Sequence, residues 1–392
     1  MKLKKILSIL LCSVMLIGIL ASCGSSETAD APETEDATGE TTSEDATDDT
    51  ATDETADAPS SDDTTTDDAG DDTSADADLP AAQGVEGKNI GICIYKFDDN
   101  FMTLYRQELE RYLTAGGATV QVMDGKNDQA EQTNQINNFI TQGVDALIVN
   151  LVQSSAAPSV TDICAAADVP VVFINREPDV EEEERWAADG IKATYVGADA
   201  RQSGTFQGEI ISSLPNKGDA NGDGVLGYAM IMGDPENVDA QYRTEFSIKA
   251  LTDNGWAEDT VENLFEQRGD WDQTKGQELA ATALAAEGDK IDVIFCNNDA
   301  MAMGALQAIE AAGRKVGEDI YLVGVDALTE ALEAIGEGRM TGTVFNDHLS
   351  QAKSAGDRAA DFIAGADVDN VYMVDYIKVT TENAQETLDK VQ

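Results

Sequence analysis

An aromatic and acidic segment stands where an apolar run meets a helix-like stretch. It reads Tyr95-Lys-Phe-Asp-Asp-Asn-Phe-Met102, between the apolar residues 90–94 and the helical spacing of 104–113. In open α/β sheets, ligands bind at the carboxyl ends of strands, where this segment would lie. Carboxylates accept hydrogen bonds from hydroxyl groups and a flat ring covers an apolar face, so the segment suits a sugar.

Polar residues also end other apolar, strand-like runs. Asn and Asp commonly cap helices, so each of them taken alone is equally well explained as a cap. Several together at the carboxyl ends of strands, in two series of strands, predict one shared cleft. These residues are Asn150, Asn175, Arg176, Asn297, Asn298, Asp299, Asp326, Asn346 and Asp347.

Strand-like and helix-like runs alternate from residue 90 to the C-terminus, and the pattern restarts after residue 196. Repeated β-α units predict parallel sheets with helices on both faces. Two successive series of such units predict an α/β fold of two doubly wound, parallel-sheet lobes.

The first 23 residues have the pattern of an export signal. Three lysines precede an uncharged apolar stretch at 6–20, and Leu20-Ala-Ser-Cys23 follows. A basic start, a short apolar run and small residues are typical of a signal peptide. The small residues before Cys23 resemble a bacterial lipobox, which implies cleavage before Cys23 and a lipid anchor on it. The alternative is an ordinary signal peptide with an incidental cysteine.

Residues 24–87 are predicted to form an acidic, disordered tether. Residues 24–80 hold 21 Asp and Glu and no Lys or Arg. Such a stretch cannot bury enough apolar area to fold, and its like charges repel. An acidic tail that gathers metal or binds a partner is the weaker alternative.

From residue 81 onward, 54 acidic and 22 basic residues give a strongly negative charge. Nucleic-acid binding needs clustered Lys and Arg, so nucleic acid is excluded as a partner. Cys93, Cys164 and Cys296 have no metal-binding spacing and are interpreted as core thiols. The only histidine, His348, is interpreted as a hinge or surface residue rather than a ligand.

Four segments together resemble the periplasmic galactose/glucose-binding protein family. They are Tyr95–Met102, Asn297-Asn-Asp-Ala-Met-Ala-Met-Gly304, Val325-Asp-Ala-Leu328 and Gly342-Thr-Val-Phe-Asn-Asp347. The resemblance runs from Lys88 to the C-terminus. It implies two lobes joined by three hinge crossings, near 196–199, 345–348 and 372–377. The first lobe would hold 88–196 and 347–374, and the second 197–346 and 375–392.

The resemblance also implies a set of ligand-binding residues on both lobes. Phe101 and Trp271 would stack on opposite faces of a sugar, so that both touch it only when the lobes close. Without the resemblance, Trp271 reads as a partly buried surface aromatic and Arg243 as a solvated helix residue. The polar members would hydrogen-bond the sugar hydroxyls: Asp99, Asn175, Asn237, Asp239, Arg243, Asn298, Asp326 and Asn346.

Asn237 is a departure, because the family has a histidine at this position. Its reach and donor geometry differ from those of histidine, so the preferred sugar is left open. Galactose or glucose is the first expectation, and a pentose or another small polyol is the second.

A second motif resembles the front of an EF-hand loop. Asp219, Asn221 and Asp223 offer side-chain oxygens at positions 1, 3 and 5, and the backbone carbonyl of Val225 stands at position 7. Position 12 is Met230 rather than Glu. The family completes its loop from a distant strand, and Asp292 stands at the matching position. The expectation is a structural Ca²⁺ ion, and the alternative is a polar Asn-Gly turn.

The expected function is that of a non-enzymatic, membrane-anchored solute-binding protein. It would capture a monosaccharide for an ABC importer and act as a monomer. The resemblance names the importer's permease and ATPase as partners, with a chemoreceptor as a further candidate. A secreted carbohydrate-active enzyme with paired carboxylates is the remote alternative.

Overall fold

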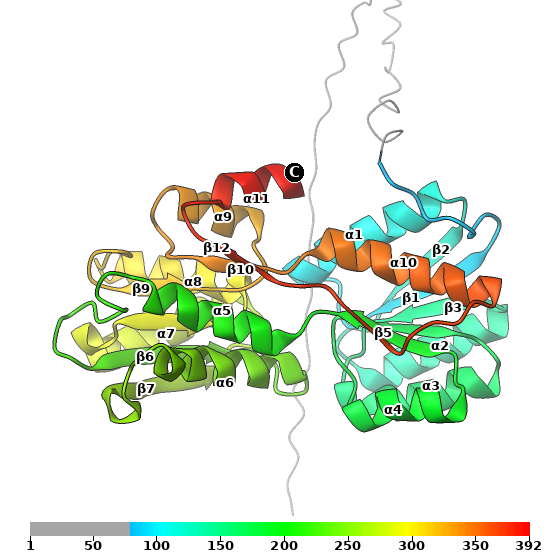
Figure 1. Ribbon diagram of the computed structural model, residues 1–392, viewed down its shortest axis with the longest axis horizontal. Coiled ribbons are helices and arrows are strands. Elements are labelled where there is room, and N and C mark those ends of the chain that lie inside the picture. The colour runs from blue at the N-terminus through cyan, green and yellow to red at the C-terminus, as the bar shows by residue number, and fades with distance from the viewer. Residues whose placement is uncertain (1–78) are drawn as a thin grey trace, which may run out of the picture. The chain divides into compact units, whose positions relative to one another are not determined.

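The computed structural model describes residues 79–392. The expected export signal with Cys23, and the acidic segment as far as residue 78, lie outside this range. The described part contains two parallel sheets, each covered by helices on both faces (Figure 1). This is the expected α/β architecture.

The first lobe is built on a six-stranded sheet in which every neighbouring pair is parallel. Its strands are short and almost entirely buried in the centre, as is usual when helices cover both faces of a sheet. In spatial order they are β11 (Val371–Met373), β5 (Ala193–Gly197), β4 (Val171–Ile174), β3 (Ala146–Val149), β1 (Asn89–Ile94) and β2 (Thr119–Asp124).

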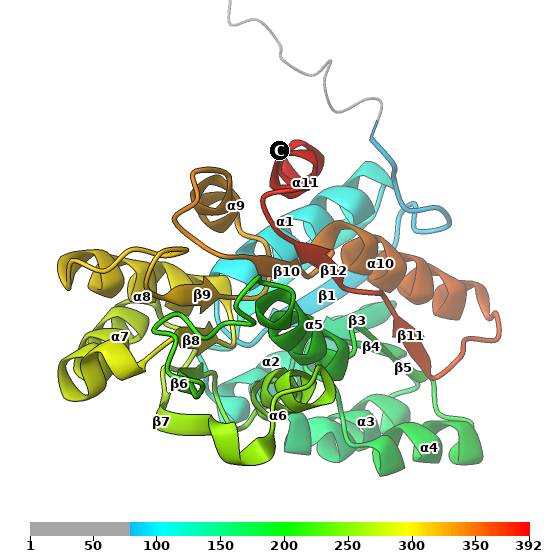
Figure 2. The same cartoon turned by 60° about the vertical axis from the view of Figure 1, so that its left-hand side comes forward.

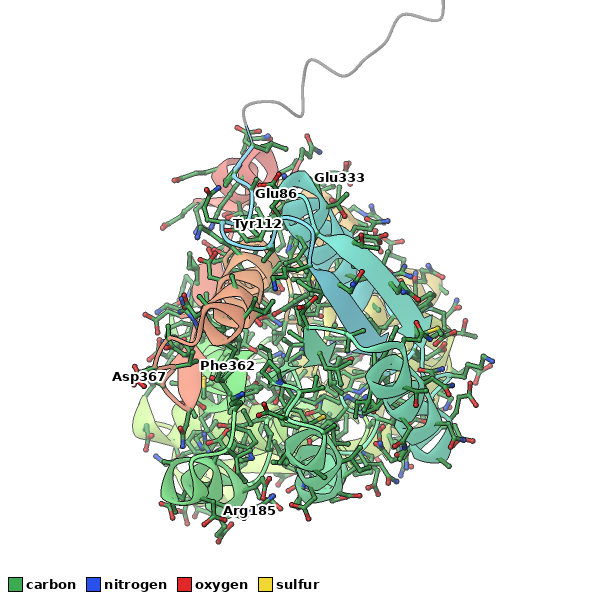
Figure 3. The ribbon with its side chains drawn as sticks, turned by 90° about the vertical axis from the view of Figure 1, so that its right-hand side faces the viewer. Glu86, Tyr112, Arg185, Glu333, Phe362 and Asp367 are labelled. Carbon is green, nitrogen blue, oxygen red and sulfur yellow. The ribbon has the colours of Figure 1, made fainter. Side chains whose placement is uncertain are left out.

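Two helix layers enclose this sheet. α1 (Asn100–Ala115) and α10 (His348–Ala364) pack on one face, with Tyr105 and Leu109 among the buried residues. Figure 3 labels Tyr112 of α1 and Phe362 of α10 in this layer, and the Tyr112 hydroxyl donates to Asp357 at 2.6 Å. The other face carries α2 (Gln129–Gln142), α3 (Ala157–Ala166) and α4 (Val180–Asp189).

The second lobe has a four-stranded parallel sheet and a short antiparallel pair. The parallel order is β7 (Val261–Arg268), β6 (Leu226–Met232), β8 (Val293–Cys296) and β9 (Tyr321–Val323). β10 (Thr343–Phe345) pairs with β12 (Ile377–Val379), as Figure 2 shows between the lobes. Single bridges from Val323 to Gly342 and from Asp326 to Phe345 join this pair to the parallel sheet.

Helices cover both faces of the second sheet. α5 (Ala200–Ser212) and α6 (Val238–Asp253) pack on one side, around Ile211 and Leu251. The other side carries α7 (Gln273–Glu287), α8 (Asp299–Ala311), α9 (Thr329–Gly336) and α11 (Ala384–Val391). Three short 3-10 turns, Ser154–Ala156, Glu258–Thr260 and Gly288–Lys290, complete the elements.

The chain passes between the two sheets three times. It leaves β5 for α5 after Gly197, returns from β10 to α10 after Phe345, and leaves β11 for β12 after Met373. The carboxyl ends of the strands in both lobes therefore face a common space that these crossings border.

Two helices were not expected from the sequence pattern, α4 and α11. β11 and β12 lie on either side of the crossing expected near 372–377, and α11 follows them. The four consecutive glutamates of α4 make its sequence read as solvent-exposed. The helix is nevertheless held to the sheet by the buried Trp186, which stacks on Phe173 with ring centroids 5.3 Å apart. Cys93, Cys164 and Cys296 are free and buried, as expected for core thiols.

Candidate functional site

A small cavity lies between the two lobes, and residues of both lobes line it. Nine of the ten expected ligand-binding residues line it, and so do Tyr95, Met102 and Arg176. The nine are Asp99, Phe101, Asn175, Asn237, Asp239, Arg243, Trp271, Asn298 and Asp326.

Asp99 lines the cavity and also begins α1. Its Oδ1 accepts from the backbone N–H of Met102 at 2.7 Å, which is the bond of a helix N-cap. Its Oδ2 accepts from the hydroxyl of Tyr95 at 2.5 Å. The carboxylate is thus held by two donors of its own lobe, so it is oriented without any help from a ligand.

Phe101 presents an aromatic ring from the same helix. Its ring packs edge-to-face against Tyr105 and against His348, with centroids 6.1 Å and 6.3 Å away, and His348 also meets Phe345 edge-on at 6.4 Å. His348 begins α10 at one of the crossings and is buried, so it is a hinge residue and not a surface residue. Burial lowers the pKa of His348, which favours the neutral ring at this position.

Asn175 directly follows β4 and has a left-handed backbone conformation with φ 62°. Its side-chain oxygen accepts from Asn150 Nδ2 at 3.1 Å. The Oδ1 of Asn150 in turn accepts from the backbone N–H of Tyr95 at 3.3 Å. Asn150 therefore braces neighbouring strand ends instead of lining the cavity. Backbone strain at ligand-lining residues is a common feature of binding sites.

Asn237, Asp239 and Arg243 form one edge of the cavity at the start of α6. Asn237 is the N-cap, with its side-chain oxygen accepting from the Asp239 N–H at 3.1 Å. Arg243 Nη2 lies 3.5 Å from Asp239 Oδ2, and Nη1 donates to the backbone oxygen of Asn297 at 2.7 Å. Arg243 is buried, which rules out a solvated helix residue.

Asp326 and Asn298 add polar atoms from two further strand ends. Asp326 has φ 118° and lies 3.9 Å from Arg243 Nη1. Asn298 caps α8 by accepting from the Met301 N–H at 3.0 Å. Asn346, the tenth expected residue, does not line the cavity. It donates to Asp326 at 3.3 Å and accepts from Gln351 of α10 at 2.6 Å, so it supports Asp326 from behind.

Trp271 closes the cavity from the second lobe. The side chain is buried, and its backbone has φ 65°, a conformation that is rare for a bulky residue. Gly233 gives the indole its space, because a Cβ at this position would overlap the ring. Phe101 and Trp271 thus reach the same cavity from different lobes.

Several buried polar atoms at the cavity lack a hydrogen-bond partner within residues 79–392. They are Asp239 Oδ1, Arg243 Nε, Arg176 Nη2 and Trp271 Nε1. Buried polar groups normally find partners, and leaving one unpaired costs about 1–3 kcal/mol. The unpaired set contains both acceptors and donors, which is what a ligand rich in hydroxyl groups would satisfy.

Two carboxyl groups that line the cavity, Asp239 and Asp326, have raised pKa values. Burial raises the pKa of Asp239 to about 6 and that of Asp326 to about 7, against the opposing effect of Arg243. Glu177, which follows Asn175 and Arg176, has its pKa raised to about 7 by burial and by the charge of Asp239. Any ligand that donates hydrogen bonds to these carboxylates will favour their ionised forms.

Three lining residues were not among those expected. Tyr95 and Arg176 belong to the strand-end segments that the sequence singled out, but neither was assigned a place in the ligand set. Met102 gave no such signal, since a methionine in the first turn of a helix reads as core. The guanidinium of Arg176 stacks on the Tyr95 ring, with Cζ 3.9 Å from its centroid.

The EF-hand-like loop is folded as a compact turn in the second lobe. Asp219 Oδ1 accepts from the Gly222 N–H at 2.7 Å, and Asp223 Oδ1 accepts from the Val225 N–H at 2.9 Å. Asp292, which directly precedes β8, reaches the loop, and its Oδ1 accepts from the Asn221 N–H at 3.0 Å. Over residues 79–392, no group of three or more His, Cys, Asp or Glu side chains is placed to hold a metal ion.

A family model described as the periplasmic binding protein domain matches residues 90–367. The chain belongs to this family. The galactose and methyl-galactoside binding periplasmic protein of Haemophilus influenzae is 34% identical over 308 residues, which is 75% of this chain and 90% of that protein. A putative rhizopine-binding protein of Rhizobium meliloti is 35% identical over 304 residues, covering 76% and 92%.

A solved structure gives the same result for the fold. An ABC transporter solute-binding protein of Bacillus halodurans, with bound myo-inositol, aligns with a TM-score of 0.68 and 29% identity, covering 78% of this chain and 99% of that one. The periplasmic binding protein described here is therefore a solute-binding component of transport and not an enzyme.

Family membership implies a location outside the cytoplasm. In the range 79–392, no helix is long and apolar enough to cross a membrane.

Proposed function

We propose that this periplasmic binding protein captures a monosaccharide, with galactose or glucose as the first candidate, and delivers it to an ABC importer. The observation that carries the proposal is the cavity between the lobes. It receives aromatic rings from both lobes, and its rim of carboxylate, amide and guanidinium groups retains unpaired atoms. Aromatic faces cover the C–H faces of a pyranose, while the polar rim binds its hydroxyl groups.

Binding by this arrangement requires the lobes to move. Because Phe101 and Trp271 lie on different lobes, an open form cannot make both contacts at once. A ligand that bridges them favours the closed form by as much as its contacts differ between the two forms. The importer's permease and ATPase would then recognise the closed, loaded form. A chemoreceptor would be a further partner that binds the same form.

A pentose or a cyclic polyol is the second candidate ligand. Asn237 replaces the histidine of the galactose/glucose-binding family, and the relatives include ribose import proteins and a protein with bound myo-inositol. Asn237 is fixed as the cap of α6, so its amide nitrogen is the group left to face a ligand.

Titration of the protein with galactose, glucose, ribose, xylose and myo-inositol tests the proposal. Calorimetry gives the affinity, and tryptophan fluorescence reports on Trp271 in the cavity. The fluorescence change should persist in Trp256→Phe, which alters a distant tryptophan, and vanish in Trp271→Phe. Absence of binding to every member of the panel would overturn the proposal.

We also propose a lipid anchor on Cys23 and a Ca²⁺ ion in the loop of residues 219–225. The loop has the oxygen-rich sequence of a calcium site, and the carboxylate of Asp292 lies against its backbone. Asp219, Asn221, Asp223, the carbonyl of Val225 and Asp292 would hold the ion, which would tie the loop to β8. Its role would be structural, because the loop residues are not among those that line the cavity.

A further inference from the structure

Arg176 and Asp234 form a buried ion pair between the lobes. Arg176 follows β4 in the first lobe and Asp234 follows β6 in the second, and Arg176 Nη1 lies 3.6 Å from Asp234 Oδ2. Their exposed fractions are 1% and 6%. The adjacent backbone adds a second contact between the lobes, because the Ser154 N–H donates to the Glu236 oxygen at 3.3 Å.

Arg176 is fixed by its own lobe. Its guanidinium stacks on Tyr95, and Nη1 also donates to the backbone oxygen of Val152. Tyr95 in turn donates to Asp99, a carboxylate that lines the cavity. Within the described residues, Nη2 of Arg176 has no hydrogen-bond partner, although the side chain lines the cavity.

Asp234 is likewise held by its own lobe, through Oδ1, which is the carboxylate oxygen that does not face Arg176. Its Oδ1 accepts from the Glu236 N–H at 3.0 Å and from Arg268 Nη2 at 3.3 Å. These bonds leave Oδ2 directed at the opposite lobe. Both partners are therefore oriented before they meet, which reduces the conformational entropy lost when the lobes close.

We propose that Asp234 is a positioning residue for ligand recognition, acting across the cleft through Arg176. When the lobes close, the Asp234 carboxylate neutralises and holds the guanidinium so that Nη2 donates to a ligand oxygen. Capture of the ligand and closure of the lobes are then coupled through one side chain. The inference rests on the proposed function, since it needs a ligand in the cavity.

The pair predicts a particular kinetic signature. Removing one partner of a buried charge pair raises the dissociation rate, whereas altering an exposed charge changes the association rate. Asp234→Asn should therefore raise the dissociation rate of the bound sugar roughly tenfold or more, with little change in association. The effect should persist in 0.5 M salt, because buried pairs are screened much less than exposed ones.

The experiment compares Asp234→Asn with Asp253→Asn by stopped-flow fluorescence, using the tightest-binding sugar of the titration panel. Asp253 lies on α6 of the same lobe in an exposed pair with Lys249, so the control makes the same charge change. Arg176→Met completes a double-mutant cycle. We expect Asp234→Asn to have no further effect on the dissociation rate in the Arg176→Met background.

Two outcomes would overturn the inference while leaving sugar binding intact. One is equal dissociation rates for Asp234→Asn and Asp253→Asn. The other is full additivity of the Asp234 and Arg176 substitutions, which would show that they act separately. If the wild-type protein binds no sugar of the panel, the proposed function fails first. Hydrogen exchange of residues 152–156, which include the bridging Ser154 amide, then still reports whether Asp234→Asn loosens the closed arrangement.

Discussion

At the scale of single residues, the side chains that line the cavity also build the helices around it. Asp99, Asn237 and Asn298 each cap a helix with one oxygen and line the cavity with the rest of the side chain. The sequence alone offered capping and ligand binding as alternatives, whereas the structure shows a cap at the rim of the cavity. A capped side chain has few rotamers left, so these groups are oriented before a ligand arrives.

Gly233 controls the position of Trp271, which gives the first prediction. Gly233→Ala should weaken sugar binding by roughly 2 kcal/mol or more, the order expected when an aromatic anchor is displaced. The added methyl group must push the indole out of its place. Calorimetry measures the loss, with Gly336→Ala as control, because a Cβ there meets no atom within 4 Å. Equal affinities for the two variants would contradict this account of Trp271.

The raised pKa values of Asp239 and Asp326 predict the pH dependence of binding. Sugar hydroxyls donate to ionised carboxylates, so affinity should rise from pH 5 to pH 8 as groups with pKa values of about 6 and about 7 ionise. Binding near pH 6 should release protons, which calorimetry in buffers of different ionisation enthalpy detects. Asp326→Asn should reduce that release, whereas a release unchanged in this variant would assign the protons elsewhere.

The same groups act on the stability of the ligand-free protein in the opposite direction. Their pKa values in the folded state lie above the ordinary value of 3.8. The folded state thus binds protons more tightly than the unfolded state between about pH 4 and pH 7, and these two groups lower the free energy of unfolding as pH rises. Asp145, Asp270 and Asp347, whose pKa values are lowered, act in the opposite direction and at lower pH, because they raise the free energy of unfolding as pH rises toward 3.8.

At the scale of elements, the loop at 219–225 is the segment that we propose to bind Ca²⁺. Ca²⁺ should raise the melting temperature, because an ion that binds only the folded state stabilises it by about 2.7 kcal/mol at 100 times its Kd. Asp223→Asn should diminish this shift. Asp289→Asn is the control, since Asp289 meets the loop only through its backbone oxygen. Identical melting curves in Ca²⁺ and in chelator would contradict the calcium site.

The elements also show how far sequence reasoning reaches. Strands such as 90–94 and 293–296 were predictable because every residue in them is apolar and buried. α4 was not predictable, because Trp186 follows five charged residues, and its packing is evident only from the tertiary stacking on Phe173. Arg176 was missed as a lining residue for a similar reason. Its stacking on Tyr95 depends on two strand ends that are 81 positions apart in the sequence.

At the scale of the whole molecule, the lipid anchor proposed on Cys23 would determine where the binding lobes are held. If Cys23 carries the lipid anchor, Cys23→Ser should move the protein from the membrane fraction to the medium or the periplasm. Fractionation followed by immunoblotting measures this shift, and Ser22→Ala is a control that keeps a small residue before the cysteine. Unchanged membrane association of Cys23→Ser, together with an unmodified mature N-terminus elsewhere, would favour an ordinary signal peptide.

The three crossings have a consequence for how the protein is made. The six-stranded sheet begins with β1 at residue 89 but is completed by β11 at residues 371–373, and α10 covers one of its faces from residue 348 onward. A nascent chain that stops before residue 348 leaves the apolar face of that sheet beside α1 uncovered and the edge of β5 unpaired. Exposed apolar faces and open strand edges favour aggregation. The first lobe to begin synthesis therefore cannot be completed until residues 348–373 have been made, and the chain gains from being kept unfolded until they have emerged.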